Sequence, residues 1–237
     1  MILIEALTVS YPNKKNVLDN LSLELKTDHI HGIVGLNGSG KTTLLNTLFG
    51  LKKCDSGTIK YKNSPLSKKY MSYLVTENYF YSNITGKEYL YLFINKTFNI
   101  EKWNALFKLP LNEIIDEYSS GMKKKLAILG TLKQNKPVMI LDEPFNGLDI
   151  ETSRILRSVL LKLKKSGKTI IITSHILETL TNLCDHIYYL ENGKIKTSKE
   201  KSKFKDLENE IFKTIEEKSE TLINELTKST NPLYSRH

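Results

Sequence analysis

The sequence has no apolar run that approaches the ~20 residues a helix needs to cross a bilayer. Its longest apolar stretches, residues 138–141 and 170–172, have the length of strands. The N-terminus carries no basic segment before an apolar one, so we expect no secretory signal. Only two cysteines are present, Cys54 and Cys184, and they are far apart with no metal-binding spacing. We therefore expect reduced thiols, as in a cytosolic protein.

The chain also lacks a concentrated basic region, although its net charge is +9. A charge of this size can indicate a nucleic acid or an anionic membrane surface as partner. Its 35 basic and 26 acidic residues are scattered, and the one tight basic cluster, residues 123–125, is expected to be solvated. We therefore expect no nucleic-acid partner. With 237 residues, 40% of them hydrophobic, the chain fits one globular domain with an additional tail.

The order of the expected elements indicates an α/β fold. Residues 2–9 and 21–25 predict an antiparallel strand pair at the N-terminus. Later strands alternate with helices, which predicts a mostly parallel sheet covered on both faces. The expected strands are 30–34, 58–61, 71–75, 138–141 and 169–173, the helices are 42–49, 151–165 and 176–183, and a hairpin turns at residues 192–193.

Two segments depart from this alternation. Residues from about 77 to 134 are expected to form a helical lobe within a domain that spans residues 1–197. Residues 198–237 are charged, with spaced apolar positions such as Phe204 and Ile215, and predict an amphipathic helix or two with a frayed end.

The segment Gly-Leu-Asn-Gly-Ser-Gly-Lys-Thr, residues 35–42, matches the phosphate-loop pattern G-x-x-x-x-G-K-[ST] in full. Glycines allow the backbone to fold around phosphate oxygens, and the helix that follows adds its positive end. It lies between an expected strand and an expected helix, which disfavours a simple glycine-rich turn with an exposed lysine. The predicted nucleotide ligands are Gly35, Asn37, Gly38, Ser39, Gly40, Lys41, Thr42 and Thr43. The pattern predicts a P-loop NTPase, without specifying which kind, in which Lys41 reaches the β and γ phosphates.

Two carboxylates follow the apolar strand 138–141. Asp142 and Thr42 are the expected ligands of Mg²⁺. Glu143 comes next and is placed to orient and deprotonate an attacking water. Carboxylates commonly end strands, so this pair is informative only together with the phosphate loop.

Three further segments make the pattern specific. Residues 141–149, Leu-Asp-Glu-Pro-Phe-Asn-Gly-Leu-Asp, resemble the Walker B segment and D-loop of ABC-type ATPases. Residues 118–126, Tyr-Ser-Ser-Gly-Met-Lys-Lys-Lys-Leu, resemble the signature segment of that family, and residues 173–175, Thr-Ser-His, its switch-histidine region. The resemblance covers residues from about 2 to 197, with the motifs in the family's order.

This resemblance implies a dimer with two composite ATP sites, formed with a second copy or a paired ABC subunit. The signature residues Ser119, Ser120 and Gly121 would face the nucleotide of the partner, and Asp149 would lie across the interface. His175 would contact the γ-phosphate. Tyr11 would stack on the adenine, which is the weakest of these assignments because the chain has 12 tyrosines.

The chain departs from the family pattern at two places. A glutamine usually begins the helical lobe, where it touches the metal and the attacking water, and here Thr76 occupies that position. Thr76 is therefore predicted as a metal ligand, and Glu77 is the alternative after a one-residue slip. In the signature, Ser120 replaces a glycine and Met122 a glutamine, a form that resembles bacterial export-type subunits.

The resemblance implies ATP hydrolysis that powers transport through a separate integral membrane permease. The chain itself would be peripheral, on the cytoplasmic face of the cell membrane. The expected docking groove lies near residues 77–91, with Tyr79, Phe80 and Tyr81 exposed, although these aromatics equally suit a local core of the lobe. Two alternatives are an ABC ATPase that acts on nucleic acid or ribosomes, disfavoured because no sustained heptads are present, and a regulator that has lost catalysis.

Overall fold

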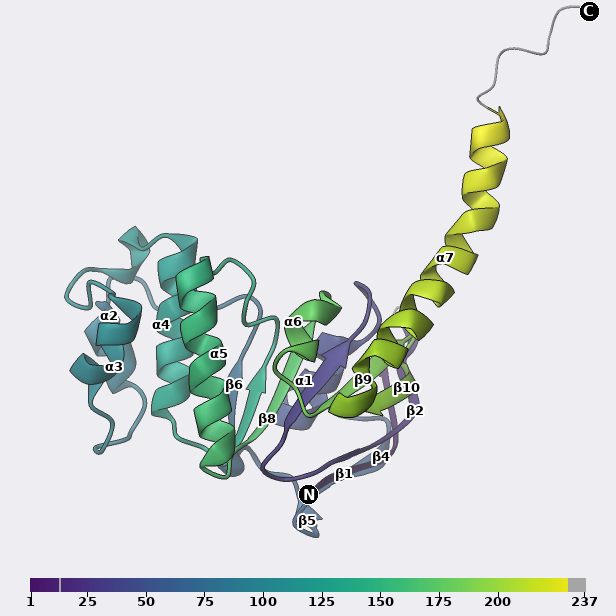
Figure 1. Ribbon diagram of the computed structural model, residues 1–237. Helices are drawn as coiled ribbons and strands as arrows, with labels where there is room; N and C mark the ends of the chain where they lie inside the picture. Colours follow the sequence, from purple (N-terminus) through teal and green to yellow (C-terminus); the bar gives the residue numbers. More distant parts are fainter. Residues whose placement is uncertain (13, 230–237) are drawn as a thin grey trace, which may run out of the picture.

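The computed structural model describes residues 1–12 and 14–229, and it contains two sheets (Figure 1). The smaller sheet is antiparallel with strand order β2-β1-β4-β5. Its first two strands pair through positions such as Ile4 and Leu23, which confirms the expected N-terminal strand pair. The bounds are β1 Ile2–Tyr11, β2 Lys14–Leu25, β4 Ser56–Tyr61 and β5 Ser64–Pro65.

The larger sheet has strand order β10-β9-β3-β8-β7-β6. All its neighbours are parallel except β9 and β10, which form a hairpin. Asn192 and Gly193 have φ values of 48° and 74°, as the predicted hairpin turn requires. The mostly parallel sheet is therefore confirmed. The bounds are β3 Ile30–Val34, β6 Met71–Leu74, β7 Val138–Leu141, β8 Thr169–Ser174, β9 His186–Glu191 and β10 Lys194–Glu200.

Most helices begin at a side chain that caps free backbone N–H groups. Thr85 and Glu88 form a capping box, while Asn99, Ser119 and Asp149 each accept the backbone N–H of the third residue of the following helix. None of the described helices is long and apolar enough to span a membrane. The bounds are α1 Lys41–Phe49, α2 Gly86–Tyr91, α3 Ile100–Phe107, α4 Ser120–Lys133, α5 Ile150–Lys165, α6 Leu177–Thr181 and α7 Phe204–Ser229, with 3₁₀ turns at Lys68–Tyr70, Ile115–Glu117 and Lys201–Lys203.

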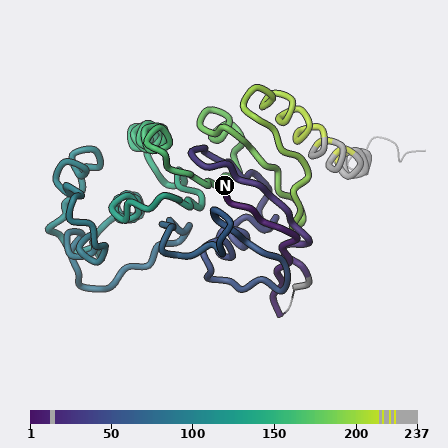
Figure 2. Tube along the Cα trace, turned by 90° about the horizontal axis from the view of Figure 1, so that it is seen from below, coloured from purple at the N-terminus to yellow at the C-terminus, as the bar shows by residue number. Residues whose placement is uncertain are grey.

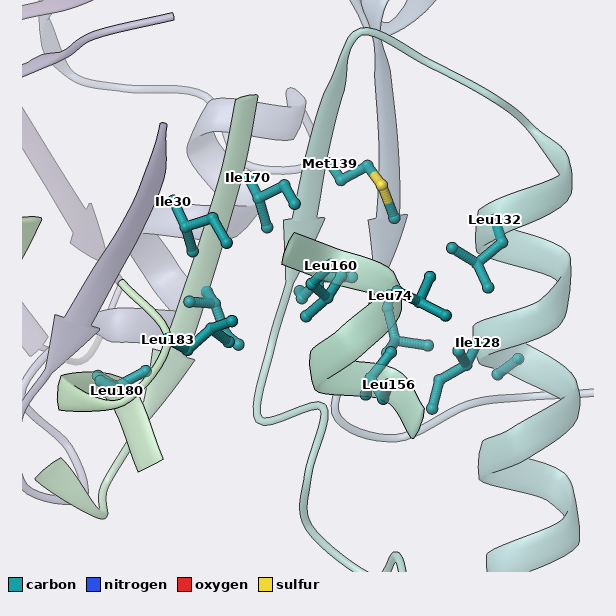
Figure 3. Close-up of a cluster of buried hydrophobic side chains, with 14 of the residues drawn as sticks. Ile30, Leu74, Ile128, Leu132, Met139, Leu156, Leu160, Ile170, Leu180 and Leu183 are labelled. Carbon is teal, nitrogen blue, oxygen red and sulfur yellow. The ribbon is translucent and has the colours of Figure 1, made fainter. Parts of the chain in front are cut away.

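The larger sheet is buried on both faces because alternate residues of its strands enter different cores. In β7, Met139 and Leu141 join the core beneath α4 and α5, whereas Val138 and Ile140 join the core shared with α1 and the smaller sheet. Figure 3 shows Ile128 and Leu132 of α4 beside Leu74 and Met139 of the sheet. Two-sided burial explains the short, continuous apolar runs read from the sequence.

The helical lobe and the C-terminal helix lie on opposite sides of the molecule (Figure 2). The segment after residue 198 differs in part from expectation, because β10 continues to Glu200 and α7 begins only at Phe204. Phe204, Leu207 and Ile211 are buried in the core beneath α6, so the start of α7 packs on the body. The division at residue 197 stays a prediction, and the expected frayed end at 230–237 lies outside the described residues.

Candidate active site

Four segments meet at one edge of the larger sheet because β3, β6, β7 and β8 are parallel and end on the same side. The phosphate loop follows β3, and Thr76 follows β6. Asp142 and Glu143 follow β7, while β8 leads into His175. The topology therefore brings together residues that are more than 100 positions apart in the sequence.

The phosphate loop has the backbone that its glycines permit. Gly38 and Gly40 adopt φ values of 79° and 109°, in the left-handed region, and α1 starts directly after Gly40. The Lys41 ammonium donates to the carbonyl oxygens of Gly35 at 2.7 Å and Leu36 at 3.2 Å. Burial lowers the pKa of Lys41, while the carboxylates of Glu143 and Asp142 oppose that shift. The loop thus holds a buried cation at the N-terminus of a helix, which suits a phosphate group.

A hydroxyl–carboxylate network joins the loop to β7 and β8. The Thr42 hydroxyl donates to one oxygen of Asp142 at 2.8 Å, and the Thr173 hydroxyl donates to the other at 2.6 Å. Asp142 is fully buried. A hydroxyl and a carboxylate oxygen are hard donors of the kind that Mg²⁺ prefers, so these residues fit the predicted metal.

Glu143 and His175 face each other, with Nδ1 of the imidazole 3.1 Å from a carboxylate oxygen. Glu143 has a φ of 48°, uncommon for a residue with a β-carbon, and its N–H donates to the Thr173 hydroxyl at 3.0 Å. Strained backbone of this kind is concentrated at functional sites. The arrangement directs the Glu143 side chain away from the sheet and toward the phosphate loop.

A cavity of about 490 Å³ lies between these groups. Most of the residues predicted to contact the nucleotide line it. They are Tyr11, Asn37, Gly38, Gly40, Lys41, Thr42, Thr43, Thr76, Glu143 and His175, joined by Val17 and Asn146.

Several predicted ligands lie outside the cavity lining. Gly35 and Ser39 pack against each other beneath the loop, and the Ser39 hydroxyl is buried without a hydrogen-bond partner. Asp142 is reached through Thr42. The signature residues Ser119, Ser120 and Gly121 are not part of the lining, and neither is Asp149.

Thr76 lines the cavity, whereas its alternative Glu77 does not and instead accepts a hydrogen bond from Tyr79 at 3.3 Å. The role of Thr76 as a metal ligand stays a prediction. Tyr11 also lines the cavity, and the Lys52 ammonium lies 4.3 Å from the centre of its ring. One face of Tyr11 is thus occupied by a cation.

The signature segment begins α4 as expected. The Ser119 hydroxyl accepts the N–H of Met122 at 3.2 Å and caps the helix. Asp149 caps α5 and also pairs with Lys125 at 2.8 Å, so it links the two helices. The neighbouring Lys124 contradicts the expectation of three solvated lysines, because it is only 8% exposed.

Sequence reasoning missed four residues of the site region: Val17, Lys124, Asn146 and Thr173. Thr173 carried a usable signal, since it is a polar residue that ends an apolar strand two positions before His175. Nothing in the sequence indicates that Lys124 is buried, because its two neighbours are also lysines.

Comparison with known proteins places this geometry in a family. A family model described as ABC transporter matches residues 18–146. The bacitracin transport ATP-binding protein BcrA of Bacillus licheniformis is 34% identical over 204 residues, which cover 80% of this chain and 66% of that protein. The lantibiotic transport ATP-binding protein SrtF of Streptococcus pyogenes is 30% identical over 222 residues, which cover 90% of this chain and 96% of that protein.

Solved structures agree on the fold. One described as the ATP binding subunit of an ABC transporter has a TM-score of 0.78 and 26% identity, and the match covers 84% of this chain and 90% of that one. A dimeric ATP-binding cassette in a post-hydrolysis state, bound to ADP and Pi, has a TM-score of 0.75 at 21% identity, with 84% and 98% covered. The chain belongs to the ABC transporter family, among its ATP-binding proteins.

Proposed function

We propose that this chain binds ATP with Mg²⁺ in the cavity above the phosphate loop and hydrolyses it to drive export through a separate membrane permease. The observation that carries the proposal is the convergence of Lys41, Glu143 and His175 on one cavity. A general base, a buried cation and an imidazole around one space are what phosphoryl transfer to water requires.

Binding would use the loop and α1. The ammonium of Lys41 would turn from its own carbonyls to the β and γ phosphates, and the backbone N–H groups from Gly38 to Thr43 would hold phosphate oxygens. Tyr11 would stack on the adenine with the face that Lys52 leaves open. Thr42, Asp142 and Thr76 would hold Mg²⁺, which neutralises charge on the phosphates.

Hydrolysis would begin when Glu143 accepts a proton from a water molecule. The oxygen of that water attacks the γ-phosphorus, and the bond to the bridging oxygen breaks, which leaves ADP and inorganic phosphate. His175 holds Glu143 through Nδ1, and its other ring nitrogen is free to approach the γ-phosphate. This division of roles argues against a regulator without catalysis.

A second copy, or a paired ABC subunit, would complete the site. Ser119, Ser120 and Gly121 form the N-terminal end of α4, which attracts anions, and they lie outside the chain's own cavity. With Asp149, they would meet the γ-phosphate held by the other subunit. Two nucleotides would thus join two copies, and hydrolysis would release them.

The permease would dock on the segment near residues 77–91. Tyr79 and Tyr81 are 85% and 70% exposed, as expected for a docking surface, whereas Phe80 packs against Tyr89 with ring centres 5.0 Å apart and belongs to the lobe's core. Docking there would hold the chain at the cytoplasmic face of the membrane. Export is inferred from the form of the signature segment, while the bacitracin and lantibiotic transport relatives favour transport over a role on nucleic acid or ribosomes.

The direct test measures ATP binding and turnover by the purified chain. Lys41→Ala should abolish measurable binding, whereas Lys194→Ala, at an exposed lysine paired with Asp19 at 2.8 Å, should leave it unchanged. Unaltered binding and cleavage by Lys41→Ala would overturn the assignment of the site.

The transport partner is tested separately, by affinity purification from solubilised native membranes. An integral membrane protein should copurify with the parent chain and be lost from the Tyr79→Ala, Tyr81→Ala double variant, whose ATP turnover in isolation should remain. Recovery of ribosomes or DNA in its place would favour the alternative role.

A further inference from the structure

Lys124 is a buried lysine without an evident structural task. It lies in the first half of α4 and is 8% exposed, in a class of residue that is rarely buried unless paired. Among the residues that the structure describes, its ammonium has no hydrogen bond or ion pair, and it is not among the fully enclosed polar atoms. A charge that is largely removed from water is costly, so nearby opposite charges are needed to compensate it.

The helix directs Lys124 toward the catalytic edge. Ile128 and Leu132, one and two turns further along α4, point to Leu74 and Met139 of the sheet (Figure 3). Residues four apart share a face, and helical side chains lean toward the N-terminus of their helix. Lys124 therefore extends this face beyond Leu74, toward the strand ends where Asp142 and Glu143 lie.

The electrostatics agree with this placement. Burial lowers the pKa of Lys124, and the carboxylates of Asp142 and Glu143, in that order, oppose the shift. The same two carboxylates act on Lys41 from the phosphate loop. Lys41 and Lys124, from two different helices, therefore both act electrostatically on the same two adjacent carboxylates.

We propose that Lys124 is a positioning residue for hydrolysis: its charge, delivered from α4, keeps the Asp142 and Glu143 carboxylates in their catalytic arrangement. The inference rests on the proposed ATP hydrolysis. Once Lys41 turns to the phosphates of a bound nucleotide, Lys124 still acts on these carboxylates from α4. Its effect therefore falls on the chemical step rather than on nucleotide binding.

The test compares the kinetics and stability of Lys124→Met with those of the parent chain. Methionine keeps the length of the buried stem and removes the charge. We expect kcat to fall about tenfold while KM for ATP changes less than about threefold, since one screened charge interaction is lost. The melting temperature should stay or rise, because an apolar group replaces a buried cation. Lys124→Arg, which restores the charge, should recover most of kcat.

The matched control is Lys133→Met, at the other buried lysine of α4. The Lys133 ammonium donates to the carbonyl of Asn95 at 3.2 Å, far along the helix from the site. This variant should lower the melting temperature and leave kcat of the folded protein unchanged. Parental kcat in Lys124→Met, or a kcat that falls only together with the melting temperature, would overturn the inference.

Additional variants distinguish a failure to fold, a failure of the proposed ATP hydrolysis and a failure of the role of Lys124. If Lys124→Met fails to fold, Lys124→Gln supplies the same comparison with a neutral side chain that hydrogen-bonds. If the parent itself turns over no ATP while Lys41→Ala and the parent bind it equally, the proposed function fails. If the parent is active and both neutral variants match it, only the role of Lys124 is lost.

Discussion

The imidazole of His175 and the carboxylate of Glu143 lie 3.1 Å apart, on residues delivered by two adjacent parallel strands. Glu143 is buried, whereas His175 lies in the bend after β8 and its side chain is 43% exposed. The Glu143 N–H donates to the hydroxyl of Thr173. His175 directly follows β8, the strand that carries Thr173. The backbone of Glu143 and the bend that holds His175 are therefore linked through the paired strands β7 and β8.

Glu143→Gln should separate binding from chemistry. The amide keeps the size of the side chain but cannot accept the proton of the attacking water, so we expect turnover to fall by about 100-fold or more. Nucleotide affinity should stay within a few-fold of the parent. Steady-state turnover and equilibrium binding of ATP, measured on the same preparation, check this. Parental turnover would instead support a regulator or another base.

Gly35→Ala should damage the fold and the site together. An added β-carbon would meet the Ser39 hydroxyl at 2.6 Å and the carbonyl of Leu190 more closely still. Overpacking of this kind costs about 1–3 kcal/mol, so the variant should unfold at a lower denaturant concentration and bind ATP poorly. Urea unfolding followed by circular dichroism measures the loss.

Gly38→Ala is the comparison for Gly35→Ala. Gly38 has open space around its α-carbon but a φ of 79°. The left-handed conformation costs an alanine about 1–2 kcal/mol without any clash. The midpoint urea concentration should therefore be lower for Gly35→Ala than for Gly38→Ala. The opposite order would show that backbone conformation, not space for a β-carbon, decides which residues this loop tolerates.

Local signals in the sequence were enough to predict the N-terminal strand pair, the mostly parallel sheet and the phosphate loop. Residues 138–141 read as a buried strand because both faces of β7 are covered, and the carboxylates that follow it could be placed from that strand alone. The loop pattern fixed the position of Lys41. These predictions held because each depends on a few consecutive residues.

Features that depend on packing between distant segments were not available from the sequence. Lys123, Lys124 and Lys125 look alike, yet Lys124 enters the interior while Lys125 pairs with Asp149. Phe80 was grouped with two exposed tyrosines, but it is covered by Tyr89 from the next helix. The rotation of α4 and the fold of the lobe decide both outcomes.

Acid should destabilise the protein through His31. Its ring is fully buried and bonded to the carbonyl of Lys26 at 2.8 Å, while the ring of His186 lies 5.5 Å away. Burial, assisted by the charges of His186 and His29, lowers the pKa of His31 to about 4, against the bond to Lys26 and the charge of Asp185. The neutral ring is thus favoured by folding.

The direction of this pH dependence of stability follows from proton binding at His31. Between pH 6.5 and 4 the unfolded chain binds a proton at His31 that the folded chain does not, so stability is complete above that window and is lost as pH falls. At pH 5 the loss relative to pH 8 should be about 2 kcal/mol. Urea unfolding of the parent and of His31→Gln at both pH values measures it. An equal loss in the two proteins would contradict the assignment to His31.

Ser119 offers a test of the two-copy site that leaves the helix cap intact. Asparagine and aspartate cap helices as well as serine does, so Ser119→Asn and Ser119→Asp should both keep the melting temperature. The aspartate, however, would place a negative charge opposite the γ-phosphate of the partner's nucleotide. In a Glu143→Gln background with ATP and Mg²⁺, the asparagine variant should form dimers on size-exclusion chromatography, and the aspartate variant should remain monomeric. Because the two variants differ only in charge at one exposed cap, dimers formed equally by both would mean that Ser119 does not meet a phosphate.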